Sequence, residues 1–108
     1  MEIVLNSIDD DKKGMFYCVY YDNSRYWGRL LKVFAEDADS VADEVEIDFL
    51  QYVGNQYWDF PKRKNKEIIK AKFLFFGPCV PSETSKKGYK FDKDEEAKSF
   101  YKNLKNLR

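Results

Sequence analysis

Runs of apolar and aromatic residues, separated by polar turn residues, predict three strands in the first third of the chain. The first covers residues 1–8. The second, residues 15–21, is apolar or aromatic on both faces, which is typical of a central strand in a sheet. The Asp-Asn-Ser run at 22–24 has the composition of a tight turn. We therefore expect the third strand, residues 26–35, to return antiparallel to the second.

The next segment, residues 36–53, carries apolar residues at the i, i+3, i+4 spacing of a helix and places most of its acids elsewhere. Ser40 and Asp43 have the spacing of a capping box, and Gly54 would end the helix. A rival interpretation is that 44–49, in which acids and apolar residues alternate strictly, forms a half-buried strand. We favour the helix because its pattern is the longer of the two.

The second half of the chain predicts one more long strand and one more helix. Residues 54–66 read as a connector that ends in a basic loop, and 67–76 as a strand. After a loop, residues 89–91 form a short strand. Asp92 then caps a helix, with Glu95 completing a capping box. The apolar side of this helix comprises Ala97, Phe100, Tyr101, Leu104 and Leu107.

The expected order is strand, strand, strand, helix, strand, helix (β-β-β-α-β-α). This order is typical of an α+β fold with a largely antiparallel sheet of four or five strands and two helices packed on it. At 108 residues, the chain is expected to be a single small domain spanning 1–108.

The composition argues against most catalytic chemistries. Histidine is absent, and this removes the Ser-His-Asp and Cys-His arrangements and most zinc sites. Two cysteines are too few for a secreted disulfide scaffold, so we expect a cytoplasmic setting. The sequence has no run of about 20 apolar residues, so we expect no membrane span. We expect a non-enzymatic protein without catalytic residues, metal or cofactor. Asp39 and Asp43, one helical turn apart, leave a Mg²⁺ site as a minor alternative.

The net charge of zero conceals two oppositely charged halves. Residues 1–60 hold 13 acids and 5 bases, a net charge of −8, and residues 61–108 hold 14 bases and 6 acids, a net charge of +8. Such a separation bears on partners rather than on the fold. Either one half contacts a partner, or the halves neutralise each other within one chain or across a head-to-tail homodimer.

The first functional hypothesis uses the acidic helix. Dense carboxylates would dock a protein partner with a basic surface, in the way that a nucleic-acid mimic does, and complementary charge would supply association rate and selectivity. By analogy, small inhibitor and immunity proteins of phages and mobile elements have this character. Ile47 and Leu50 would add apolar anchor area, unless the rest of the chain covers them. The predicted partner-binding residues are Asp39, Asp43, Glu46, Ile47 and Leu50.

The alternative hypothesis is a nucleic-acid-binding domain that uses the basic segment 62–72. Its lysines and arginine would contact phosphates, and Tyr57 or Trp58 would stack on bases. The sequence pI of about 6.3 counts against this alternative, because a basic pI is the usual footprint of such domains. The predicted nucleic-acid-binding residues are Lys62, Arg63, Lys64, Lys66, Lys70 and Lys72.

Overall fold

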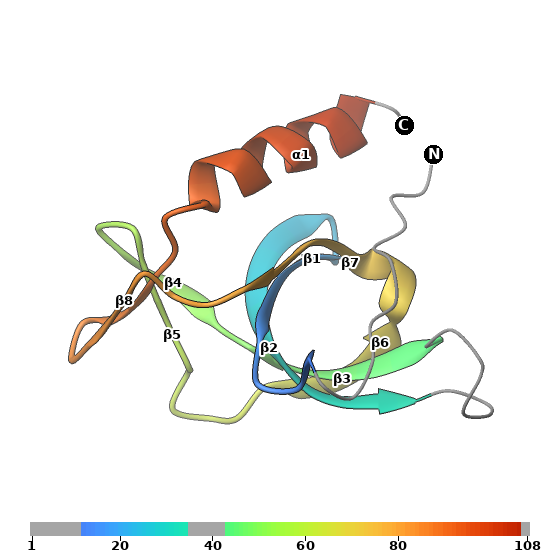
Figure 1. Ribbon diagram of the computed structural model, residues 1–108, viewed down its shortest axis with the longest axis horizontal. Coiled ribbons are helices and arrows are strands. Elements are labelled where there is room, and N and C mark those ends of the chain that lie inside the picture. The colour runs from blue at the N-terminus through green and yellow to red at the C-terminus, as the bar shows by residue number, and fades with distance from the viewer. Residues whose placement is uncertain (1–11, 35–42, 107–108) are drawn as a thin grey trace.

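The computed structural model describes residues 12–34 and 43–106, with side chains as far as residue 104. In these residues two antiparallel sheets, of five and four strands, and one C-terminal helix form a small compact domain (Figure 1). The α+β class and the largely antiparallel pairing are therefore confirmed. The expectation of two helices is wrong, because the described residues hold one α-helix, α1 (Asp94–Asn106). No helix among them is long and apolar enough to cross a membrane.

The five-stranded sheet curves strongly, so that it appears in Figure 1 as a nearly closed ring. All of its neighbouring strands are antiparallel. Its edge strands, β6 and β7, are joined by one 3-10 turn, η2 (Ala71–Phe73), which carries the chain from one edge of the sheet to the other. In spatial order the strands are β6 (Lys66–Lys70), β3 (Glu44–Phe49), β2 (Ser24–Phe34), β1 (Phe16–Tyr21) and β7 (Leu74–Cys79).

Strand β1 has the central position that its sequence predicts. It pairs with β2 on one side and with β7 on the other. Tyr17 and Val19 belong to one buried cluster, and Phe16 and Cys18 to another, so both faces of the strand are covered. The β1–β2 turn also forms where expected: Asp22 and Asn23 both have positive φ, 52° and 60°, as the favoured two-residue hairpin turn requires.

The four-stranded sheet contains one strand that the sequence pattern predicted, β9, and three that it did not resolve into strands. A second hairpin turn, with positive φ at Asn55 and Gln56, replaces the expected helix stop and joins β4 to β5. The sheet lies to one side of the curved sheet (Figure 1). In spatial order its strands are β4 (Gln51–Gly54), β5 (Tyr57–Asp59), β9 (Gly88–Lys90) and β8 (Glu83–Ser85).

The predicted helix over 36–53 is wrong for its described part. Residues 44–49 form β3 and 51–54 form β4, so the rival strand interpretation is the one that the structure shows. Burial follows the alternation: Val45, Ile47 and Phe49 enter one hydrophobic cluster. The helical pattern failed because it grouped Val45 and Phe49 with Tyr52 and Val53, which are exposed on β4, and placed the buried Ile47 off the apolar face. Residues 36–42 lie outside the described residues.

Three further boundaries differ from expectation. The strand predicted at 67–76 is two strands, β6 and β7, because η2 interrupts it. The last helix begins at Asp94 rather than after an Asp92 cap, and the Ala97 N–H donates to the Lys93 carbonyl at its first turn. The short strand predicted at 89–91 is found as β9. The strand predicted at 1–8 lies outside the described residues.

Helix α1 is attached to the curved sheet by a buried polar contact as well as by apolar packing. The Asp94 carboxylate accepts hydrogen bonds from Arg25 Nη1 at 2.6 Å and from Trp27 Nε1 at 2.8 Å, both at Oδ1. The side chains of Arg25 and Asp94 are 11% and 18% exposed. Ala97 is fully buried in the cluster that also holds Trp27. The first residue of the helix is therefore fixed on β2.

Candidate functional site

Within residues 43–48, the acids lie opposite or beside bases of the chain itself. Strand β3 lies between β2 and β6, which place bases opposite its acids: Arg29 and Lys66 face Asp48, Lys32 faces Glu46, and Lys70 faces Glu44. Cross-strand pairs of opposite charge are the stabilising kind. Lys70 Nζ lies 3.3 Å from an Asp43 carboxylate oxygen and 4.0 Å from a Glu44 oxygen, and Arg29 lies 3.8 Å from Asp48.

The predicted partner-binding residues are not gathered on one exposed face. Ile47 and Leu50 are 0% and 1% exposed and belong to two different hydrophobic clusters, so the chain covers both of them. Asp43 is exposed, and Glu46 is half-buried. Asp39 lies outside the described residues. The apolar anchors expected among the acids are therefore core residues.

The predicted basic set divides into two groups. Lys62, Arg63 and Lys64 are exposed in the loop that leads to β6, and Lys66 is exposed at the first position of that strand. None of these four makes an ion pair within the part of the chain that the structure describes. Lys70 pairs with Asp43 instead, and the Lys72 ammonium lies 5.5 Å from the centre of the Phe73 ring. Lys62, Arg63 and Lys64 thus keep their charge available, whereas Lys66 lies opposite Asp48 of β3.

A groove of about 370 Å³ joins this basic loop to the end of the curved sheet. Such a volume lies at the small end of the range of ligand pockets. Tyr26 of β2 and Phe49 of β3 belong to its lining. The loop contributes Pro61, Arg63, Lys64 and Asn65. The loop is held there because the Phe49 N–H donates to the Asn65 carbonyl at 3.0 Å.

Phe49, which lines the groove, packs against two tyrosines at the sheet end, of which Tyr26 lines the groove and Tyr21 does not. Tyr21 stacks on Phe49 with ring centroids 5.3 Å apart, and Tyr26 meets Phe49 edge-on at 5.8 Å. Tyr21 and Tyr26 are half-buried, so part of each ring stays accessible. A hydrogen bond with Glu67 and, to a smaller extent, burial raise the pKa of Tyr21, which keeps its phenol neutral at physiological pH.

The sequence pattern pointed to different aromatic residues. Trp58 is 5% exposed and packs in the core, where its Nε1 has no hydrogen-bond partner among the described residues. The Tyr57 hydroxyl donates to Glu83, and the Lys90 ammonium lies 4.9 Å from the Tyr57 ring centre. Tyr26 and Phe49 are therefore the aromatics that line the groove with the basic loop. The place of Tyr26 at the start of a predicted strand was a signal for that residue, whereas Phe49 lay inside the predicted helix and had none.

The two thiols are not activated for nucleophilic chemistry. Burial raises the pKa of Cys18 to about 12, against the opposing effect of the Arg25 guanidinium. Burial also raises the pKa of Cys79, and the neighbouring Lys93 only partly offsets this. Both side chains are therefore protonated near neutral pH, whereas a nucleophilic cysteine needs the thiolate. In the described residues no group of three or more acidic or thiol side chains is placed to hold a metal ion.

Alkylation with iodoacetamide should separate the two thiols. In the native protein near neutral pH, Cys18 should react about a thousandfold more slowly than a free thiol, because a pKa near 12 leaves almost no thiolate and the strand is covered on both faces. Cys79, which is half-buried, should react first. In guanidinium chloride both should react at similar rates. Peptide mass spectrometry follows the labelling of each cysteine. Rapid labelling of Cys18 in the native protein would contradict its burial in β1.

No protein-family model, curated protein or solved structure matches this chain.

Proposed function

We propose that this domain binds single-stranded nucleic acid in the groove between Tyr26, Phe49 and the 61–65 loop. The observation that carries the proposal is that Arg63 and Lys64, which make no ion pair within the described residues, line the same groove as the half-buried Tyr26. Proteins that bind single strands combine a cationic track for the backbone with aromatic side chains for the bases. The groove contains both parts within one small volume.

In the proposed complex each side of the groove has its own task. A base would stack on the exposed part of Tyr26, whose ring orientation is fixed by its edge-on contact with Phe49. Arg63 and Lys64 would contact the phosphates on either side of that base, and Lys62 and Lys66 would extend the track along the strand. A stacked duplex cannot offer a base face to Tyr26, so single strands should be preferred.

The test is fluorescence anisotropy with labelled single-stranded and duplex oligonucleotides at low and moderate salt. The native protein should prefer the single strand and lose affinity as salt rises, with a slope of up to about −3 in log K against log salt for four phosphate contacts. The double variant Arg63→Ala/Lys64→Ala should bind at least about tenfold more weakly and should reduce that slope by about 1.4. Tyr26→Leu keeps an apolar side chain against Phe49 but removes the aromatic ring, so its affinity for the single strand should fall about fivefold or more.

A charge-matched control comes from the β8–β9 turn. Lys86→Ala/Lys87→Ala removes the same charge from two exposed lysines away from the groove, and should leave binding nearly unchanged. If both double variants lose the same affinity, binding is a diffuse effect of net charge and the groove is not the site. If the native protein binds no oligonucleotide even at low salt, the proposal is wrong.

A protein partner with a basic surface is the second candidate. It is favoured by Asp43, whose side chain is 72% exposed although it pairs with Lys70. Exposed ion pairs contribute little, so an incoming cation could compete for this carboxylate. In this case Asp43→Asn combined with Glu46→Gln should weaken binding to a polylysine probe, whereas Arg63→Ala/Lys64→Ala should not weaken it. The opposite pattern would remove this candidate.

A further inference from the structure

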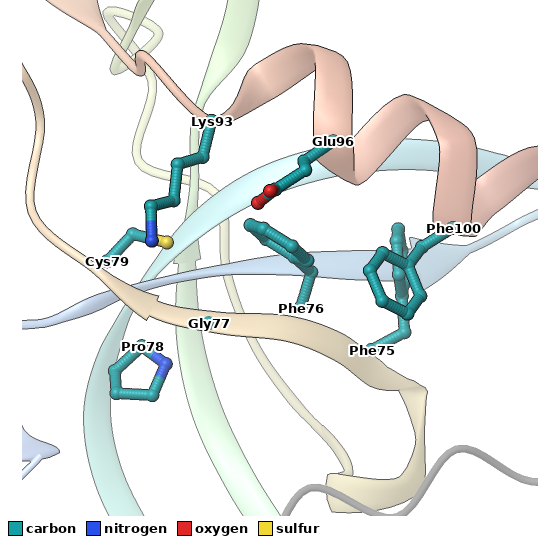
Figure 2. Close-up of a pocket in the computed structure, with 8 residues that line it drawn as sticks. All are labelled: Phe75, Phe76, Gly77, Pro78, Cys79, Lys93, Glu96 and Phe100. Atoms are coloured by element: carbon teal, nitrogen blue, oxygen red, sulfur yellow. The ribbon is translucent and has the colours of Figure 1, made fainter.

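A second groove, of about 280 Å³, lies between edge strand β7 and helix α1, far along the chain from the loop discussed above. Figure 2 shows it lined from below by the strand and from above by the helix. Phe76 and Phe100 form its aromatic wall, with ring centroids 5.5 Å apart. Phe100 is 40% exposed, and Val80, immediately after the strand, is 65% exposed. Phe100 therefore presents exposed apolar surface in the groove, and Val80 presents more next to its Cys79 end.

The groove also carries one charge of each sign. Lys93 lies at the end of the groove near Cys79, and Glu96 points toward Phe76 nearer its middle (Figure 2). Neither side chain makes an ion pair within residues 12–34 and 43–106. This contrasts with Lys98 on the same helix, which lies 3.3 Å from Glu95. The two free charges and the exposed apolar residues together make a neutral, two-signed surface.

The strand itself limits what can dock there. Among residues 12–34 and 43–106, strand β7 pairs with β1 alone and forms an edge of the five-stranded sheet. However, Pro78 lies in that edge, and proline cannot donate to a ladder of backbone hydrogen bonds, which is how edge strands avoid pairing. An added peptide strand is therefore disfavoured, and the occupant should be held by side chains.

We propose that the occupant is a second copy of this chain, in a two-fold dimer in which the β7–α1 grooves face each other. A two-fold axis that passes between Lys93 and Glu96 exchanges these two positions. Lys93 of each copy then faces Glu96 of the other, and Val80 of each copy packs toward the aromatic wall of the other. The same surface thus satisfies both of its unpaired charges, which a partner of a single charge sign would not do.

Sedimentation velocity over a roughly hundredfold range of concentration tests this dimer. The full chain should move from a monomer of 12.9 kDa to twice that mass as concentration rises. Lys93→Glu should weaken dimerisation at least about tenfold by placing two acids opposite each other, and Phe100→Lys should abolish it. A chain that stays monomeric throughout would overturn the proposal.

A charge exchange distinguishes this geometry from other dimers. The double variant Lys93→Glu/Glu96→Lys restores opposite charges across the two-fold axis, so it should recover dimerisation to within about threefold of the native protein. Lys102→Glu, an exposed position of α1 outside the groove lining, should leave the equilibrium unchanged. A native-like dimer in Lys93→Glu, or a double variant as weak as the single one, would overturn the proposal. This dimer does not depend on nucleic-acid binding, because the two grooves share no lining residue.

Discussion

Replacing Asp94 by Ala should destabilise the domain by about 3 kcal/mol or more, because this one carboxylate satisfies two buried donors. The Arg25 side chain is only 11% exposed. Without Asp94, its guanidinium retains the contacts with the Cys18 sulfur at 3.8 Å and the Trp58 ring at 5.6 Å, and neither group carries a negative charge to balance it. The Trp27 indole N–H, in a fully buried side chain, loses its acceptor as well. Denaturation by urea, read from tryptophan fluorescence, measures the change.

Two substitutions on the same helix turn make this expectation specific. Asp94→Asn retains an oxygen that can accept a hydrogen bond from Trp27 but removes the charge beside Arg25. Its free energy of unfolding should therefore lie between that of the native protein and that of Asp94→Ala. Glu95→Ala removes an exposed acid whose described ion-pair partner is Lys98, and should cost less than about 0.5 kcal/mol. An Asp94→Ala protein as stable as Glu95→Ala would show that the helix is held by apolar packing alone.

The first part of the fold could be predicted because its local signals agree with its tertiary contacts. Strand β1 is apolar on both faces and is covered on both faces. Asp22 and Asn23 favour the left-handed backbone that the hairpin adopts. Helix α1 was predictable because Ala97 and Tyr101 lie on one side of a 3.6-residue period. In each case one pattern had one interpretation.

The secondary structure of residues 44–54 could not be predicted because a helical and a strand periodicity both fit the same sequence. Val45 and Phe49 are four apart, as on a helix face, and they are also both on the same face of an alternating strand. What decides between these interpretations is long-range: bases of β2 and β6 on both sides of the acids, and Leu50 turning into a second cluster. The 3-10 turn at Ala71–Phe73 likewise follows from strand pairing at opposite sheet edges, which no local pattern records.

The candidate site could be predicted only in its charged part. Lys62, Arg63 and Lys64 stand out in the sequence as a basic run after a proline, and they line or adjoin the groove. Their aromatic counterparts come from β2 and β3, and only the hairpin geometry brings Tyr26 to Phe49. Ile47 was placed on the wrong surface for the same reason that the helix was wrong, since a period error moves a side chain from the core to the solvent.

Gly88→Ala should be the most damaging small substitution in the four-stranded sheet. A Cβ at this position would lie 2.5 Å from the Trp58 carbonyl oxygen, which belongs to the backbone of the neighbouring strand and cannot rotate away. Gly88 also has φ +121°, which side chains rarely adopt. Steric crowding of about 1–3 kcal/mol therefore adds to backbone strain of similar size, and we expect a loss of about 3 kcal/mol or more.

Gly54→Ala separates the two causes, because Gly54 has φ +97° but no atom within 4 Å of an added Cβ. It should lose only the conformational part, about 1–2 kcal/mol, whereas Gly88→Ala must also push β9 away from β5. That displacement carries Tyr89, whose ring lies 5.4 Å from Phe16 and 5.7 Å from Phe60, out of the contact between the two sheets. Urea denaturation of both variants gives the difference. Equal losses would mean that β9 yields at no energetic cost, and that the four-stranded sheet is only loosely attached to the rest of the domain.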